Sequence, residues 1–111
     1  MNAHVDLTNL REMTDGDKDM EKELFKEFYS SFEAGLGALQ AGTGSSAAEA
    51  WRKQAHALKG MALNLGAAKL GELCKTAQDS QAAAENLKQE LLGNIQAEYE
   101  QVKAYLLRLH P

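Results

Sequence analysis

Ala55-His-Ala-Leu-Lys-Gly-Met-Ala-Leu-Asn-Leu-Gly-Ala67 is the stretch of the sequence that decides the fold. Its apolar side chains recur at spacings of three and four residues, which is the period of a helix with one buried face. The residues with this spacing are Leu58, Met61, Ala62 and Leu65. At about 100° per residue, His56 lies roughly 200° around the helix from Leu58. The pattern therefore predicts a helix that holds His56 away from its buried face.

The residues around His56 on this helix favour the approach of a large anion. Lys59 and Gly60 follow it by three and four residues, so they lie on the same face. A glycine inside a helix costs about 1 kcal/mol relative to alanine, which indicates that Gly60 has a packing or access role. A lysine beside the ring favours negative charge. The alternative interpretation is an ordinary solvent-exposed histidine without a function.

The motif His-x-Leu-Lys-Gly at residues 56–60, followed by Gly66-Ala67, closely resembles the phosphoacceptor helix of histidine phosphotransfer (HPt) domains of phosphorelays. The run from Leu70 to Cys74 is also similar to the family. Gln78 matches a glutamine that lies near the phosphorylated ring in several members. Ala62 departs from the pattern, because many members carry serine there.

The resemblance implies that His56 accepts a phosphoryl group, with Lys59, Gly60 and Gln78 around it. An ordinary histidine, with a pKa of about 6.5, is mostly neutral at pH 7 and keeps a lone pair for attack. We expect Nε2 to carry the phosphoryl group and the other ring nitrogen to donate to water or to Gln78. The implied partners are receiver domains of response regulators or hybrid histidine kinases, with an aspartyl phosphate and bound Mg²⁺.

A partner also needs a docking surface near the histidine. Leu63 lies about 20° from His56 around the helix and two turns further on, so it should be exposed. Met13 and Met61 add apolar area if the N-terminal helix packs nearby. Arg52 and Lys53 are candidates to meet acidic residues of a receiver, although solvated helix charges are an equally good interpretation.

Length and composition indicate one helical domain over residues 1–111. The chain is 44% hydrophobic and 25% charged, and it contains a single proline and a single cysteine. A formal net charge of −4 argues against a nucleic-acid binder, which carries a basic face, and against an anionic membrane surface. A lone cysteine excludes an internal disulfide and fits a cytoplasmic setting. No signal pattern or apolar run of the roughly 20 residues that span a bilayer is present.

Apolar periodicity and capping residues predict the arrangement of the helices. A short helix carries Leu7, Leu10 and Met13, with Asp6 or Thr8 as its cap, and four longer helices follow. We expect the first of these to run from residue 16 or 17 to residue 40. The second should be capped by Ser45 or Ser46 and end near residue 65 or 66. The third should cover residues 67 to 78 or 79, and the fourth residues 82–109. Four amphipathic helices with short connections predict an all-α, antiparallel up-down four-helix bundle. The short N-terminal helix should lie across one end as a lid.

Several site types receive no support from the sequence. There is no phosphate-binding loop and no nucleotide-binding segment, so the chain is not expected to use ATP. The resemblance then implies a carrier rather than an enzyme. The three histidines lack metal-ligand spacing, so no bound metal or cofactor is expected, and Mg²⁺ should come from the receiver. Cys74 and Trp51 should be buried, and glutamates such as Glu98 should be solvated.

Two alternatives to the phosphocarrier remain open. One is a helical interaction module that binds a partner without phosphate, and the other is the phosphoacceptor domain of a chemotaxis-type kinase. Helix caps at both ends favour a free-standing protein, which we expect to be a monomer. The cognate kinase, the pathway and the direction of phosphoryl flow do not follow from the sequence.

Overall fold

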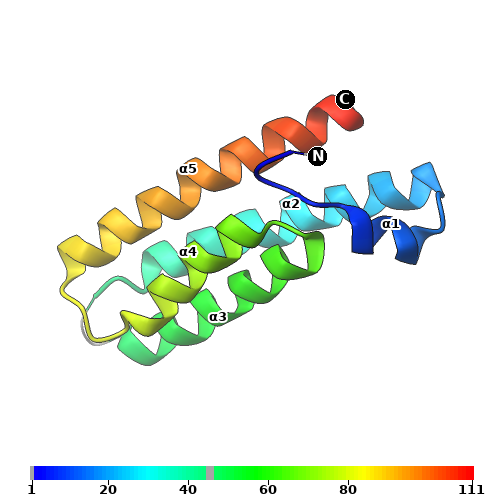
Figure 1. The fold of residues 1–111 in the computed structure, drawn as a ribbon. Helices are drawn as coiled ribbons and strands as arrows, with labels where there is room; N and C mark the ends of the chain where they lie inside the picture. Colours follow the sequence, from blue (N-terminus) through cyan, green and yellow to red (C-terminus); the bar gives the residue numbers. More distant parts are fainter. Residues whose placement is uncertain (1, 45–46) are drawn as a thin grey trace.

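The computed structural model describes residues 2–44 and 47–111. Its helices are α1 (Thr8–Thr14), α2 (Lys18–Ala41), α3 (Ala48–Leu65), α4 (Ala68–Asp79) and α5 (Glu85–Leu109). Helices α2 to α5 run alternately up and down, and α1 lies at one end of the bundle against α2 (Figure 1). The molecule measures 45 × 21 × 21 Å. The predicted all-α bundle with a short N-terminal helix is confirmed.

Two predicted helix ends have clear physical causes. Asp17 caps α2, and its carboxylate accepts a hydrogen bond from the N–H of Met20 at 3.0 Å. Gly66 ends α3 in the left-handed conformation, with φ of 102°, which glycine adopts without steric cost. Its carbonyl accepts the N–H of Asp6 at 2.9 Å, and a Cβ on Gly66 would lie 1.9 Å from the carbonyl oxygen of Asp6. The N-terminal segment therefore packs against this turn because Gly66 has no side chain.

The first residue of the last helix was predicted wrongly. α5 begins at Glu85 rather than Ala82. Residues 81–84 reverse the chain between α4 and α5, with the N–H of Ala83 bonded to the Ser80 carbonyl and Ala84 in an extended conformation. The helix-forming tendency of alanine is weak enough for this connection to override it.

The predicted caps of two other helices have different outcomes. Ser45 and Ser46 lie outside the described residues, and Ala47 occupies the N-cap position of α3 without a side-chain hydrogen bond. Leu7 occupies the N-cap position of α1. The Asp6 carboxylate nevertheless accepts the N–H of Thr8 at 3.0 Å, so it does bind the start of this helix.

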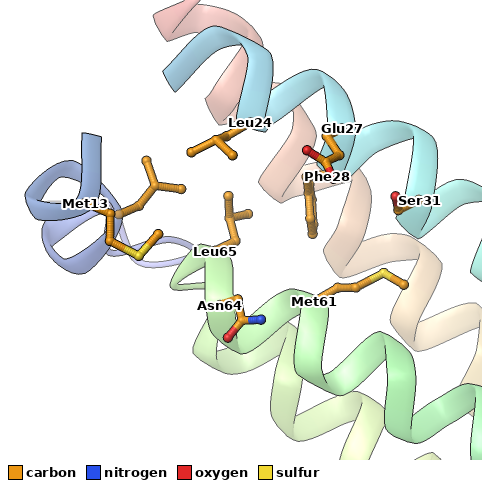
Figure 2. Close-up of a pocket in the computed structure, with 9 residues that line it drawn as sticks. Met13, Leu24, Glu27, Phe28, Ser31, Met61, Asn64 and Leu65 are labelled. Carbon is orange, nitrogen blue, oxygen red and sulfur yellow. The ribbon is translucent and has the colours of Figure 1, made fainter. Parts of the chain in front are cut away.

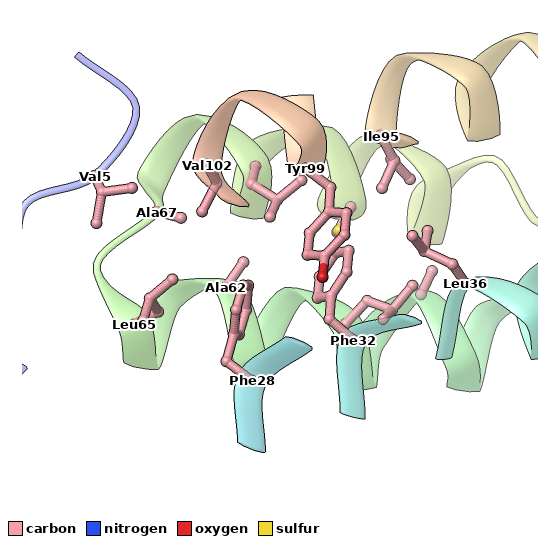
Figure 3. Packing of buried hydrophobic residues seen from close by; sticks show 14 of the residues in the cluster. Val5, Phe28, Phe32, Leu36, Ala62, Leu65, Ala67, Ile95, Tyr99 and Val102 are labelled. Carbon is pink, nitrogen blue, oxygen red and sulfur yellow. The ribbon is translucent and has the colours of Figure 1, made fainter. Parts of the chain in front are cut away.

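The core fills the space between α2, α3, α4 and α5 (Figure 3). Phe32 and Tyr99 stack with their ring centroids 4.8 Å apart. Trp51 and Cys74 are fully buried, as predicted, and burial raises the pKa of the Cys74 thiol to about 12. Tyr29 is half-buried at the edge of this core.

Several surface predictions for α2 and α5 were wrong. The helical spacing of apolar residues places Met20 and Leu87 on the buried faces of their helices, but they are 48% and 42% exposed. Glu98 was expected in solvent but is buried, with its Oε2 2.7 Å from Nδ1 of His4. Lys88 is also buried, and its ammonium lies 5.4 Å from the centroid of the Trp51 ring. The N-terminal segment explains Glu98, because it places His4 beside α5, and no helical period encodes that contact.

No helix in the described part of the chain is long and apolar enough to cross a membrane.

Candidate functional site

His56 lies on α3 with its side chain exposed, as predicted. Its Nδ1 is 3.4 Å from Oε1 of Gln78 on α4. Two helices therefore build the site, and a buried contact fixes their register. The indole Nε1 of Trp51, on α3, donates to the carbonyl of Ala77, on α4, at 2.7 Å. Because Ala77 directly precedes Gln78, this bond holds the amide next to the ring.

The contact with Gln78 has a consequence for the chemistry of the ring. An amide oxygen only accepts hydrogen bonds, so Nδ1 must be the protonated nitrogen when it bonds to Oε1. In the neutral ring, Nε2 then carries the lone pair. This is the nitrogen that the sequence analysis predicts as the nucleophile.

The surface beside His56 is open. A Cβ added to Gly60 would meet no atom within 4 Å, so this glycine faces free space. Lys59 is half-buried on the same face of α3. A group that approaches His56 therefore meets open space at Gly60 and the neighbouring Lys59.

The two other predicted cations lie one turn before His56. Arg52 is paired with Glu49, and its Nε lies 3.2 Å from Oε2 of that residue. This hydrogen bond raises the pKa of Arg52 and lowers the pKa of Glu49. Lys53 is exposed. The charge of Arg52 is thus partly balanced within the chain.

Two of the predicted partner contacts come together in a groove between α1, α2 and α3 (Figure 2). Met13, which is 71% exposed, and Met61 both line it. The groove has a volume of about 260 Å³. Its other lining residues are Leu10, Leu24, Glu27, Phe28, Ser31, Asn64 and Leu65.

Leu63 is exposed as predicted, at 52%, but it does not line this groove. Its side chain lies on the flank of α3 that faces α4. A Cβ added to Gly71 of α4 would lie 2.6 Å from Cδ2 of Leu63. The apolar residues near His56 therefore form two separate areas, one on each flank of α3.

Sequence reasoning missed the role of two glycines. Gly35 interrupts the helical pattern of α2, and a Cβ there would lie 2.6 Å from Cδ2 of Leu58. Its missing side chain lets α2 approach α3. Gly71 lets α4 accommodate Leu63 in the same way. Their occurrence inside helical patterns was a signal of close packing, but the packed residue could not be read from it.

Among the described residues, no three histidine, cysteine, aspartate or glutamate side chains gather into a group that could hold a metal ion.

Comparison with known proteins places this geometry in a family. The sequence profile of the Hpt domain family matches residues 23–105. The crystal structure of histidine-containing phosphotransfer protein B (HptB) from Pseudomonas aeruginosa PAO1 is similar over 97% of this chain and 95% of its own, with a TM-score of 0.84 and 25% sequence identity. None of the curated proteins matches the chain. The chain therefore belongs to the Hpt domain family, and it is a phosphocarrier of a phosphorelay rather than an enzyme.

Proposed function

We propose that His56 is the phosphoacceptor, and that it takes a phosphoryl group from the aspartyl phosphate of one receiver domain and returns it to another. The observation that carries this proposal is the environment of the ring. The ring is exposed, its Nδ1 faces Oε1 of Gln78, and Gly60 leaves open space beside it. In the neutral ring with Nδ1 as the donor, this arrangement leaves the lone pair on Nε2, which a bulky group can reach.

The transfer step follows from this tautomer. The lone pair of Nε2 attacks phosphorus, and a P–N bond forms. The bond from phosphorus to the aspartate oxygen breaks, and the carboxylate leaves with its electron pair. The proton on Nδ1 stays on the ring and donates its hydrogen bond to Oε1 of Gln78. The reverse step delivers the group to the aspartate of a second receiver.

Positioning supplies most of the catalysis that this chain contributes. Holding the two reacting groups in line converts a bimolecular step into an effectively unimolecular one. The rigid bundle fixes the ring through Trp51, Ala77 and Gln78. Lys59 offers a positive charge to the phosphoryl oxygens. We propose that the receiver supplies Mg²⁺, since the residues beside His56 are Gln78, Lys59 and Gly60, and none of them carries a carboxylate.

The receiver is proposed to dock over His56 and the groove at Met13 and Met61. A standard protein interface buries about 800 Å² per partner, a patch roughly 28 Å across. Asn64, in the groove, follows His56 by eight residues, or roughly 12 Å along the helix axis at 1.5 Å per residue. One footprint therefore covers the ring, Leu63 and the groove.

Incubation with a phosphorylated receiver tests the proposal. The chain should acquire a label that is lost in acid and stable in alkali, as expected for phosphohistidine. The His56→Ala variant should acquire none, while His4→Gln, which removes another histidine, should be labelled normally. Label that survives in His56→Ala contradicts the assignment. Receiver binding without any transfer would instead support a pure interaction module.

A further inference from the structure

Leu63 is an exposed residue whose side chain rests against a neighbouring helix. It is 52% exposed and lies on the face of α3 that carries His56. A Cβ added to Gly71 would be 2.6 Å from its Cδ2 and 3.0 Å from its Cγ. A separation of 2.6 Å is too short for a real Cβ, so this orientation of Leu63 depends on the absence of a side chain at Gly71.

The backbone of Gly71 gives no other reason for a glycine. The glycines with positive φ are Gly16 and Gly66, and Gly71 lies within α4. An alanine there would favour the helix more strongly. Apart from Leu63, the nearest atom to the added Cβ is the Cβ of Ala62, at 3.9 Å, which is an ordinary contact. The packing role of Gly71 is therefore to accommodate Leu63.

The position of Leu63 connects this packing to the site. Leu63 follows His56 by seven residues, which is two turns or roughly 10 Å along the helix. It also forms one wall of a hollow of about 290 Å³, which the N-terminal segment and the start of α4 complete. The orientation of one leucine thus sets both an apolar contact beside His56 and the shape of the hollow next to it.

We propose that Gly71 is a positioning residue for receiver docking, because it holds Leu63 in the orientation that contacts the receiver. The inference rests on the proposed function of His56. A side chain that already packs against a neighbouring helix loses less conformational freedom on binding than one that is free in solvent. Gly71 touches neither the ring nor the phosphoryl group, so its effect should fall on docking and not on the reactivity of His56.

The Gly71→Ala variant tests this role, with Gly93→Ala as the matched control. A Cβ on Gly93 of α5 meets no atom within 4 Å, so both substitutions improve helix propensity but only Gly71→Ala displaces Leu63. In transfer from a phosphorylated receiver, the half-saturating concentration should rise about threefold to tenfold for Gly71→Ala. It should stay unchanged for Gly93→Ala. The maximal rate, and labelling of His56 by the small donor phosphoramidate, should be unchanged in both.

A double-substitution cycle separates positioning from general damage to α4. Leu63→Ala should weaken docking by a similar factor, and Gly71→Ala should add nothing further in that background. An unchanged half-saturating concentration in Gly71→Ala overturns the proposal. The proposal is also overturned if Gly71→Ala raises the half-saturating concentration as much in the Leu63→Ala background as in the wild type, because Gly71 would then act without Leu63. A wild-type chain that phosphoramidate labels but no receiver phosphorylates would instead refute receiver transfer itself.

Discussion

At the scale of single residues, the site depends on one hydrogen bond to a histidine ring. Oε1 of Gln78 lies 3.4 Å from Nδ1 of His56, which is long for such a bond. Its contribution is therefore modest in energy, but it selects which nitrogen keeps the proton. The lone pair on Nε2 is the consequence that matters for the proposed attack on phosphorus.

Replacement of Gln78 by alanine should slow phosphorylation of His56 by about twofold to fivefold, the lower part of the range for loss of a neutral hydrogen bond. The effect should appear with a receiver and with phosphoramidate alike, because the ring itself changes. Nitrogen-15 NMR should show a smaller fraction of the Nδ1–H tautomer. Gln96→Ala, on the exposed side of α5, is the control. Unchanged rates and tautomer populations in Gln78→Ala would refute this role.

Cys74 gives a second prediction at this scale. Burial raises the pKa of its thiol to about 12, and the thiolate is the reactive form. A thiol reagent at pH 8 should therefore modify the native chain slowly and the urea-unfolded chain rapidly. Fast modification of the native chain would show that Cys74 is exposed.

At the scale of helices, the pairing of α3 with α4 determines the site. Trp51, at the start of α3, bonds to the carbonyl at the end of α4 that precedes Gln78. The apolar spacing predicted the burial of Trp51, and glycine at position 66 predicted the end of α3. The residues that adjust the distance between helices, Gly35 and Gly71, could not be interpreted from sequence, because their contacts come from a different helix.

The Trp51→Phe variant should lower the free energy of unfolding by about 1–3 kcal/mol, because it removes a buried hydrogen bond to the Ala77 carbonyl and leaves the space of the larger indole unfilled. Urea unfolding measures this loss. Phosphorylation of His56 should also slow to the level of Gln78→Ala, because the end of α4 is no longer held. Wild-type stability together with wild-type phosphorylation would show that the indole bond does not set the register of the helices.

At the scale of the whole molecule, contacts between distant parts of the chain close one end of the bundle. Glu21 of α2 is buried between Arg11 of α1, at 2.8 Å, and His110 at the C-terminal end, at 2.7 Å. The sequence predicted α1 as a lid but not these pairs, and it placed both outer histidines outside any role. The contact between Glu21 and His110 joins residues 89 positions apart, so it leaves no local pattern in the sequence.

The pKa of Glu21 makes this cluster testable. Burial opposes its ionisation, but hydrogen bonds from Arg11 and His110 outweigh burial and leave the pKa below its usual value of 4.5. The unfolded chain therefore binds the proton first, and the stabilisation is present above about pH 4.5 and lost as the pH falls through the lower folded value. Glu21→Gln should be less stable than wild type by about 1–3 kcal/mol at pH 7.

Urea unfolding between pH 7 and pH 3 measures the difference in the free energy of unfolding between the wild type and Glu21→Gln. The difference in stability between the wild type and Glu21→Gln should become smaller as the pH falls below 4.5. Asp19→Asn, an exposed neighbour on α2, serves as the control and should follow wild type. A difference in stability that stays constant down to pH 3 would mean that the ionised form of Glu21 does not stabilise the fold.

The most direct test of the central claim is NMR of the phosphorylated chain. Long-range hydrogen–nitrogen spectra identify both the modified residue and the modified nitrogen. We predict a P–N bond at Nε2 of His56, with the signals of the remaining core unchanged. Phosphorus bound at Nδ1, at His4, at His110 or at a carboxylate would contradict the account.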